Sequence, residues 1–202
     1  MSKLIFATNN RHKVEEIKNV IGDLFEIVSL NEAGIHIDIP EPYETLEENA
    51  TTKSKTIHEL TAENCFSEDT SLEVFALNGE PGVKSARYAG EDKTAKDNIE
   101  KLLLNMANQT ERSARFRTVI SLILDGSEHQ FEGICNGRIA EKPSGESGFG
   151  YDSVFVPEGS AKTFGQMNLA EKNIYSHRKI ATTKLLRFLS ENGKERLNLR
   201  SF

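Results

Sequence analysis

The stretch SEDTSLEVFALNGEPGVKSARYAG, residues 67–90, is the part of this chain from which the fold is best worked out. Adjacent carboxylates, Glu68 and Asp69, follow a short apolar pair and precede an alternating, strand-like segment from Leu72 to Leu77, which ends in glycine turns. A carboxylate pair at the end of a short buried strand can hold a divalent cation or take a proton in a cleft. The alternative is an acidic strand end that lies in water.

Length and composition indicate one globular domain, residues 1–202, with enough chain for a sizeable core. Hydrophobic residues make up 37% and charged residues 28%, which is ordinary for a folded protein in water. The net charge of −6 disfavours a nucleic-acid polymer as partner, and no basic run counters it. A small anionic ligand remains possible if a few cations and a metal ion gather in one place.

The sequence favours a cytoplasmic protein. The apolar run near the N-terminus is too short for a signal peptide, and the longest apolar stretch, Val119 to Leu124, is too short to span a membrane. Cys65 and Cys135 are the only cysteines, so no disulfide framework is expected, which fits a reducing compartment.

An anion site is one interpretation of the N-terminal segment. Lys3 to Thr8 is typical of a buried strand, and a helix with helical apolar spacing follows directly after Asn9 and Asn10. Free backbone N–H groups and the positive end of the helix dipole point into such a turn, and Lys13 can add a full charge. An ordinary capped helix with a surface lysine is the alternative.

A stiff loop and a second helix follow. Glu41 lies between two prolines, which can aim its carboxylate or can simply make a rigid surface loop. Thr45 with Glu48 predicts a capping box for a helix to about residue 63. Lys53 lies on that helix, as a ligand group or as a solvated lysine.

A glycine-rich segment, residues 141–150, ends in Gly148-Phe149-Gly150-Tyr151-Asp152. An aromatic side chain between two glycines has little cover from its neighbours, so a flat purine base or a packed loop must cover Phe149. Upstream, two strands joined at Asp125-Gly126 predict a hairpin.

The last helix is predicted to begin after Ser176 and to end at Gly193. His177 and Arg178 then lie in its first turn, where positive side chains oppose the helix dipole. Function explains that placement better than stability does.

Read together, these segments resemble the inosine triphosphate pyrophosphatase family, the hydrolases of non-standard purine nucleoside triphosphates. The resemblance covers nearly the whole chain in order, through FATNN…K at residues 6–13, ENA…K at 48–53, NG.PGV.SARYAG at 78–90, GFGYD at 148–152 and EKN..SHR at 171–178.

The resemblance implies an elongated α/β fold: a mixed β-sheet flanked by helices, in two lobes with a central cleft. It implies a homodimer that uses Mg²⁺ and hydrolyses ITP, dITP and XTP to the monophosphate and pyrophosphate by water attack on the α-phosphorus. The metal would be held by Glu41 and Asp69, with Glu68 near or behind it. Asp69 would activate the water, and Lys13, with Lys53, would stabilise the leaving group.

Further roles follow from the same resemblance. Triphosphate binding falls to Thr8, Asn9, Asn10 and Lys13, and Thr70 would touch the phosphates. The base would be held by Phe149, Gly150, Tyr151, Asp152, Lys172, His177 and Arg178.

Two departures and two alternatives accompany the resemblance. Ser71 replaces a glycine of the usual Asp-Asp-Ser-Gly-Leu pattern, which matters if that position needs positive φ, and Ser153 replaces a common proline. A nucleotide sensor of the same fold without catalysis is one alternative. A phosphohydrolase that cuts at the γ-phosphate or acts on a modified pyrimidine is the other, although the chain lacks a GxxxxGK[ST] loop.

Overall fold

The computed structural model describes residues 3–199, and for residues 193–199 only the course of the backbone. The helices and strands, in chain order, are β1 (Lys3–Phe6), α1 (Arg11–Ile21), β2 (Glu26–Ser29), α2 (Leu46–Thr61), β3 (Cys65–Val74), β4 (Pro81–Gly82), α3 (Ala95–Asn105), β5 (Ser113–Leu124), β6 (Ser127–Ile139), β7 (Phe155–Pro157), α4 (Leu169–Lys172) and α5 (His177–Leu199). Within the described residues, no helix is both long and apolar enough to cross a bilayer.

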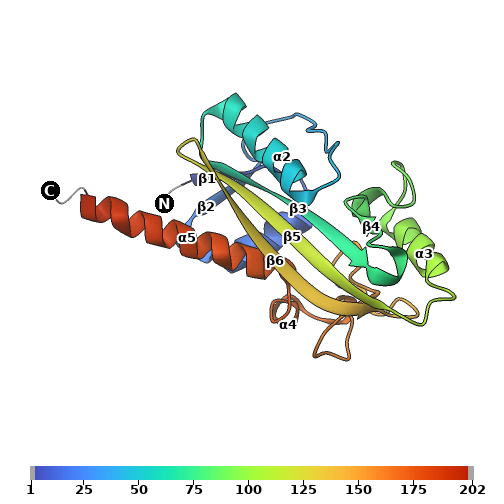
Figure 1. Ribbon diagram of the computed structural model, residues 1–202. Coiled ribbons are helices and arrows are strands. Elements are labelled where there is room, and N and C mark those ends of the chain that lie inside the picture. Colours follow the sequence, from blue (N-terminus) through green and yellow to red (C-terminus); the bar gives the residue numbers. More distant parts are fainter. Residues whose placement is uncertain (1–2, 200–202) are drawn as a thin grey trace.

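One mixed seven-stranded sheet runs through the molecule in the order β2-β1-β3-β5-β6-β7, with β4 paired to β3. The short strands β1 and β2 are parallel, and β1 also runs parallel to β3. The long strands β3, β5 and β6 are antiparallel to one another and form the long central part of the sheet (Figure 1).

Helices cover both faces of the first half of this sheet. On one face, α1 and α5 bury a core around the stacked rings of Phe6 and Phe66, whose centroids lie 4.5 Å apart. On the other face, α2 lies across the strands (Figure 1), and its Leu46 and Ala50 pack against Val119 of β5. These layers form the first lobe.

The second lobe forms around the far ends of β3, β5 and β6. Its core includes Leu72, Phe116, Phe155 and Phe164, and α3 packs there through Leu102 and its neighbours. Two cores strung along one elongated mixed sheet confirm the expected α/β fold with two lobes.

The carboxylate pair lies inside a strand, not at a strand end as the sequence predicted. β3 is continuous over ten residues, and the predicted strand segment beyond Val74 is a 3₁₀ turn from Phe75 to Leu77. The prediction was wrong because polar residues interrupt the apolar run. In the structure, Ser67, Glu68 and Asp69 find partners on the helices that cover the sheet. Thr70 shares a hydrogen bond with the neighbouring strand β5.

The last helix also differs from its predicted extent. It begins at His177, as expected after Ser176, but it runs past Gly193 to Leu199. A glycine in a helix interior costs about 1 kcal/mol relative to alanine, which is too little to end a helix by itself. Other local signals predicted the structure correctly: Thr45 caps α2, and its hydroxyl accepts from the backbone N–H of Glu48 and donates to the Glu48 carboxylate at 2.6 Å. Asp125 and Gly126, both at positive φ, make the predicted hairpin turn between β5 and β6.

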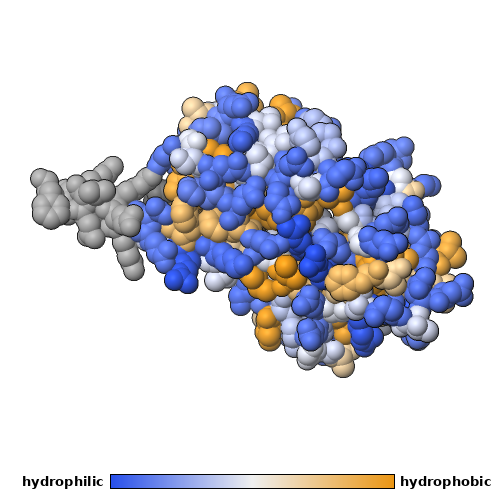
Figure 2. All heavy atoms as spheres, in the orientation of Figure 1, coloured by the Kyte–Doolittle hydropathy of each residue, from blue (hydrophilic) through white to orange (hydrophobic). Residues whose placement is uncertain are grey.

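Hydrophilic residues dominate the face of the molecule shown in Figure 2, and hydrophobic residues form small separate patches on it.

One glycine, Gly133 of β6, sets how closely α5 approaches the sheet. A Cβ atom at Gly133 of β6 would lie 2.0 Å from the carbonyl oxygen of His177 and 2.6 Å from the amide nitrogen of Ala181. Because these are backbone atoms, they could not move aside without shifting the start of α5.

We therefore expect Gly133→Ala to lower the free energy of unfolding by about 1–3 kcal/mol, the usual effect of overpacking. Urea unfolding followed by circular dichroism measures this difference. Asn136→Ala, at an exposed position of the same strand, is the matched control and should unfold like the wild type. Equal stability of Gly133→Ala and wild type would show that α5 is not held at this distance.

Candidate active site

A single cleft between the two lobes collects side chains from α1, β3, β5, α4, α5 and several loops. Its lining comprises Asn10, Lys13, Glu41, Asp69, Thr70, Leu72, Val83, Ser85, Ala86, Phe116, Phe149, Gly150, Tyr151, Asp152, Lys172, His177 and Arg178. Residues far apart in the sequence therefore share one surface.

The alternation of β3 sends its two neighbouring carboxylates to opposite faces of the sheet. Glu68 lies on the face covered by α1 and α5, where its partners are Lys13 and Arg178. Asp69 lies on the face covered by α2, where its partner is Lys53. The two acids thus have different surroundings although they are adjacent in the chain.

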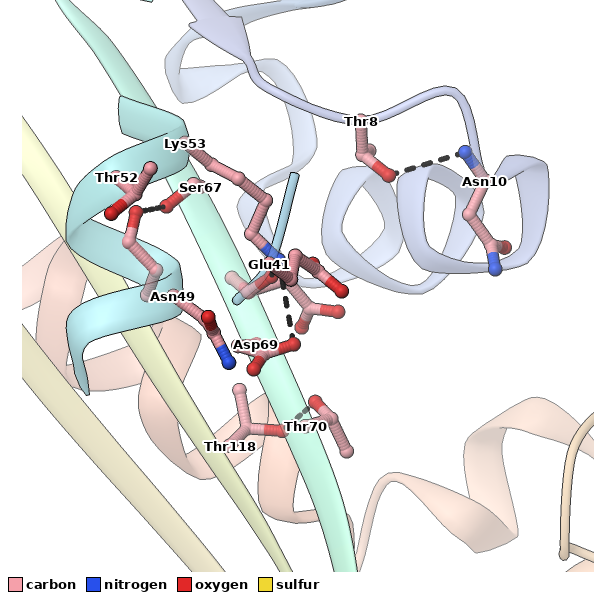
Figure 3. Close-up of polar contacts among 12 residues, drawn as sticks. Thr8, Asn10, Glu41, Asn49, Thr52, Lys53, Ser67, Asp69, Thr70 and Thr118 are labelled. Atoms are coloured by element: carbon pink, nitrogen blue, oxygen red, sulfur yellow. Dashed lines mark hydrogen bonds and ion pairs between the residues drawn. The ribbon is translucent and has the colours of Figure 1, made fainter. Parts of the chain in front are cut away.

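Asp69 forms an acidic corner of the cleft with Glu41 (Figure 3). Lys53 of α2 lies between them: its Nζ atom is 3.4 Å from Oδ1 of Asp69, forms a short ion pair with Glu41 and donates to the carbonyl oxygen of Glu68 at 2.8 Å. Burial raises the pKa of Asp69; the charge of Lys53 opposes this and that of Glu41 adds to it. A carboxylate with a raised pKa accepts a proton more readily than a solvated one.

The loop that carries Glu41 is held at two points. The side-chain amide of Asn49, on α2, accepts from the backbone N–H of Tyr43 at 3.1 Å and donates to the carbonyl oxygen of Tyr43 at 3.0 Å. Arg87, from the second lobe, donates to the backbone carbonyl of Glu41 at 3.2 Å. Glu41 is therefore fixed by both lobes.

The start of α1 forms the next part of the cleft. Asn10 caps the helix by accepting from the backbone N–H of Lys13, and its own N–H donates to the hydroxyl of Thr8 (Figure 3). Free N–H groups at a helix start favour an anion. Asn9 is turned away, because its side chain accepts from the backbone N–H of Asn31 after β2.

A buried ion-pair network stands behind the cleft and centres on Arg178. Its guanidinium donates twice to Glu68, at 2.7 and 3.0 Å, and once to Glu16 of α1, at 2.5 Å. Lys13 makes a further ion pair with Glu68, at 2.9 Å. Burial alone would raise the pKa of Glu68, but the charges of Arg178 and Lys13 hold it well below its usual range.

Lys172 extends this network to the glycine-rich loop. Its Nζ atom contacts Glu16 at 2.7 Å and Asp152 at 2.6 Å, and Asp152 accepts from the backbone N–H of Phe149 at 2.9 Å. The loop that carries Phe149 is thereby tied to α1 and α4.

His177 lies beside this network but stays neutral. Burial lowers its pKa well below the usual value, and the charges of Arg178 and Lys172 lower it further. Its ring stacks on Phe116, with centroids 4.6 Å apart, and its Nδ1 atom is buried without a hydrogen-bond partner. His177 therefore borders the cleft as a neutral, stacked ring.

The structure brings most residues of the predicted site to the cleft. The four that do not line it have structural contacts instead: Thr8 holds Asn10, Asn9 holds the chain after β2, Lys53 bridges Glu41 and Asp69, and Glu68 pairs with Lys13 and Arg178. Thr70 shares a hydrogen bond with Thr118 of β5 at 2.6 Å (Figure 3). The departure at Ser71 is accommodated, because that residue is not at positive φ.

Sequence reasoning missed Glu16, which joins Lys172 and Arg178. A signal was available: Glu16 adjoins Ile17 on the buried side of α1, where a charged residue needs a partner. It also missed Asn49 as a support of the Glu41 loop and Phe116 as a wall of the cleft.

The acidic corner fits a divalent cation of the magnesium type. The described residues contain no group of three or more His, Cys, Asp or Glu side chains that could hold a metal ion alone. Mg²⁺ does not need one, because it is usually bound by one or two carboxylates together with water and substrate phosphates. Lys53 contacts one oxygen of each carboxylate, Oε1 of Glu41 and Oδ1 of Asp69, and the second oxygen of Glu41, Oε2, has only a long ion pair with Arg87 at 3.8 Å. Each carboxylate therefore keeps an oxygen that a cation could take.

Comparisons with known proteins agree on one family. The profile of the Ham1 family matches residues 4–188. A dITP/XTP pyrophosphatase of Porphyromonas gingivalis is 48% identical over 190 residues, which cover 94% of this chain and 98% of that protein. The dITP/XTP pyrophosphatase of Christiangramia forsetii is 45% identical over 189 residues, 94% of this chain and 100% of that protein. The solved structure of the Staphylococcus aureus Ham1 protein has a TM-score of 0.86 and 39% identity and covers 95% of this chain and 100% of that one.

The geometry predicts that Glu16→Gln destabilises the protein. The substitution removes the negative charge shared by two buried cations, and we expect it to lower the free energy of unfolding by about 2–4 kcal/mol in urea. Glu15→Gln is the matched control, because Glu15 is the exposed neighbour on the same helix. If both variants unfolded at the same urea concentration, the network would not stabilise this fold.

Proposed function

The chain belongs to the Ham1 family and is a hydrolase of non-standard purine nucleoside triphosphates, and we propose that the cleft between its lobes carries out the reaction. One observation supports this most: a single cleft is lined by Lys13 and Asp69 and also by Phe149, Lys172 and Arg178. The first pair suits a triphosphate and the second group suits a purine, so one nucleotide can use both.

The triphosphate lies over the start of α1 in this proposal. The N-terminus of α1 and the ammonium of Lys13 supply positive charge where the substrate is most negative. Glu68 holds Lys13 in place from behind. As pyrophosphate leaves, the charge that develops on it is stabilised by groups that are already oriented.

Asp69 acts as the general base. It takes a proton from water while the water oxygen forms a bond to the α-phosphorus and the bond from that phosphorus to the bridging oxygen breaks. The products are the nucleoside monophosphate and pyrophosphate. In the absence of a bound cation, burial raises the pKa of Asp69, which makes its carboxylate a better proton acceptor than a solvated one.

Glu41 and Asp69 would hold Mg²⁺, with phosphate oxygens completing its coordination. When bound there, the ion would supply positive charge that polarises the phosphoryl group. Lys53 keeps the two carboxylates together and carries part of the compensating charge. Glu68 orients Lys13 and Arg178 from behind the cleft.

The choice among purine bases depends on the hydrogen-bond donors of the cleft and on the group that each base presents to them. Lys172 has three N–H groups and two carboxylate partners, so one N–H is left for a ligand. Hypoxanthine and xanthine offer an oxygen acceptor at position 6, whereas adenine presents an amino donor there. A donor that faces a donor leaves buried groups unpaired, which can discriminate by about 10⁴-fold.

The proposal also includes the homodimer that the family resemblance implies and a cytoplasmic location. Both cysteines of the described chain are free and buried, which suits a reducing compartment. Sedimentation equilibrium of the purified protein measures the assembly.

The function is tested by incubating the protein with XTP, ITP, ATP and GTP, with and without Mg²⁺, and identifying the released product. We expect pyrophosphate from XTP and ITP and little turnover of ATP. Release of orthophosphate would indicate cleavage at the γ-phosphate. Binding of XTP without any product would indicate a nucleotide sensor.

Replacing the general base should abolish most turnover. We expect Asp69→Asn to lower kcat for XTP by at least ~10²-fold, because an amide cannot take the proton. An Asp69→Asn variant with near-normal kcat would contradict the role of Asp69.

Replacing Glu41, the other acid of the corner, should change how XTP hydrolysis depends on the Mg²⁺ concentration. We expect Glu41→Gln to raise the Mg²⁺ concentration for half-maximal XTP hydrolysis by about tenfold or more, since one of two carboxylate ligands is lost. Glu44→Gln, exposed in the same loop, is the control. An unchanged Mg²⁺ requirement in Glu41→Gln would place the metal elsewhere.

A further inference from the structure

The ring of Phe149 is already covered on one face by a side chain that the proposed mechanism does not use. His12, in the first turn of α1, stacks on Phe149 with ring centroids 5.0 Å apart and planes 10° apart. Offset, nearly parallel rings at this distance attract each other beyond the area they bury.

Phe149 forms a wall between two hollows. One is the cleft described above. The other lies behind the glycine-rich loop and is lined by residues that include His12, Glu15, Phe149 and Met167. Phe149 borders both hollows, whereas His12 borders only the outer one. His12 therefore covers the outer face of the ring, and the other face is left to the cleft.

The backbone of Phe149 is fixed, but that does not fix the plane of its ring. Its N–H donates to Asp152, which Lys172 holds. The neighbouring Gly150 is at positive φ, and a Cβ atom there would meet nothing within 4 Å. Lys172 Nζ and Arg178 Cζ also lie over the ring, 5.2 and 5.5 Å from its centroid, whereas His12 is a flat ring whose plane lies within 10° of that of Phe149.

We propose that His12 is a positioning residue for the base: it backs Phe149 so that the face of the ring toward the cleft stands parallel to the bound purine. This inference rests on the proposed function, because it takes a purine to be the group that stacks on Phe149. The bound state is a stack of three flat groups: His12, Phe149 and the purine.

This arrangement also links the two ends of the substrate. His12 and Lys13 are adjacent in the first turn of α1, and Lys13 faces the cleft while His12 faces the outer hollow. The first turn of α1 thus carries both Lys13, which contacts the phosphates in the proposed mechanism, and His12, which supports the ring of Phe149. The separation between base and phosphates is set by one rigid element.

The role predicts a defined change in the kinetics of XTP hydrolysis. His12→Ala should raise KM by about 3- to 10-fold, the range expected for loss of one aromatic pair, with kcat within about twofold of wild type. His12→Phe keeps a stacking ring without the imidazole nitrogens and should return KM to within about twofold of wild type.

Inorganic tripolyphosphate separates this role from a phosphate contact. It has no base, so its inhibition constant should be the same for His12→Ala and wild type if His12 acts through Phe149. Weaker inhibition of His12→Ala would assign His12 to the phosphates and overturn the proposal. Arg11→Ala, the exposed neighbour in the same turn, is the control and should match wild type with both ligands.

A double-mutant cycle tests whether His12 acts through the ring. In the Phe149→Ala background, His12→Ala should not change KM further, because the ring that it supports is gone. A KM of His12→Ala equal to wild type, or an equal further loss in the Phe149→Ala background, would overturn the role of His12 alone. Absence of XTP turnover by the wild type would instead overturn the proposed function.

Discussion

The structure depends on the burial of one guanidinium. Arg178 is 2% exposed, and a charge in that position is stable only when carboxylates pair with it. Glu68 from β3 and Glu16 from α1 supply them, and these contacts join α1, β3 and α5 at one point. Lys13 and Lys172 are drawn to the same two acids. The cationic side chains that line the cleft are therefore held in place by Glu68 and Glu16, which lie behind it.

The alternation of side chains along β3 places Glu68, a structural acid, and Asp69, the proposed general base, on opposite faces of the sheet. Glu68 points to the cations behind the cleft, and its pKa is held low, so it stays ionised as a support. Asp69, one residue later, points to the opposite face, and burial raises its pKa. A shift of one residue in the register of β3 would exchange these roles, because it would turn every side chain to the other face. The ten-residue pairing with β5 fixes that register.

Local signals in the sequence predicted much of the fold. The N-cap at Thr45 and the turn at Asp125-Gly126 depend on nearby residues only, and both are in the structure. The family resemblance pointed to the residues that line the cleft. The continuity of β3 could not be predicted, because its polar residues are buried by partners distant in sequence. Glu16 was missed although its place on the buried side of α1 was a signal, and its partner Arg178 is over a hundred residues away. The contact of His12 with Phe149 spans a similar separation, and nothing local predicts it.

The most direct test of this account is a crystal structure with Mg²⁺ and a non-hydrolysable analogue of XTP. The account predicts the purine on the face of Phe149 opposite His12, the phosphates over the start of α1 beside Lys13, and the α-phosphorus as the phosphorus nearest Asp69. A nucleotide whose base lies away from Phe149, or whose γ-phosphate is the group nearest Asp69, would contradict it.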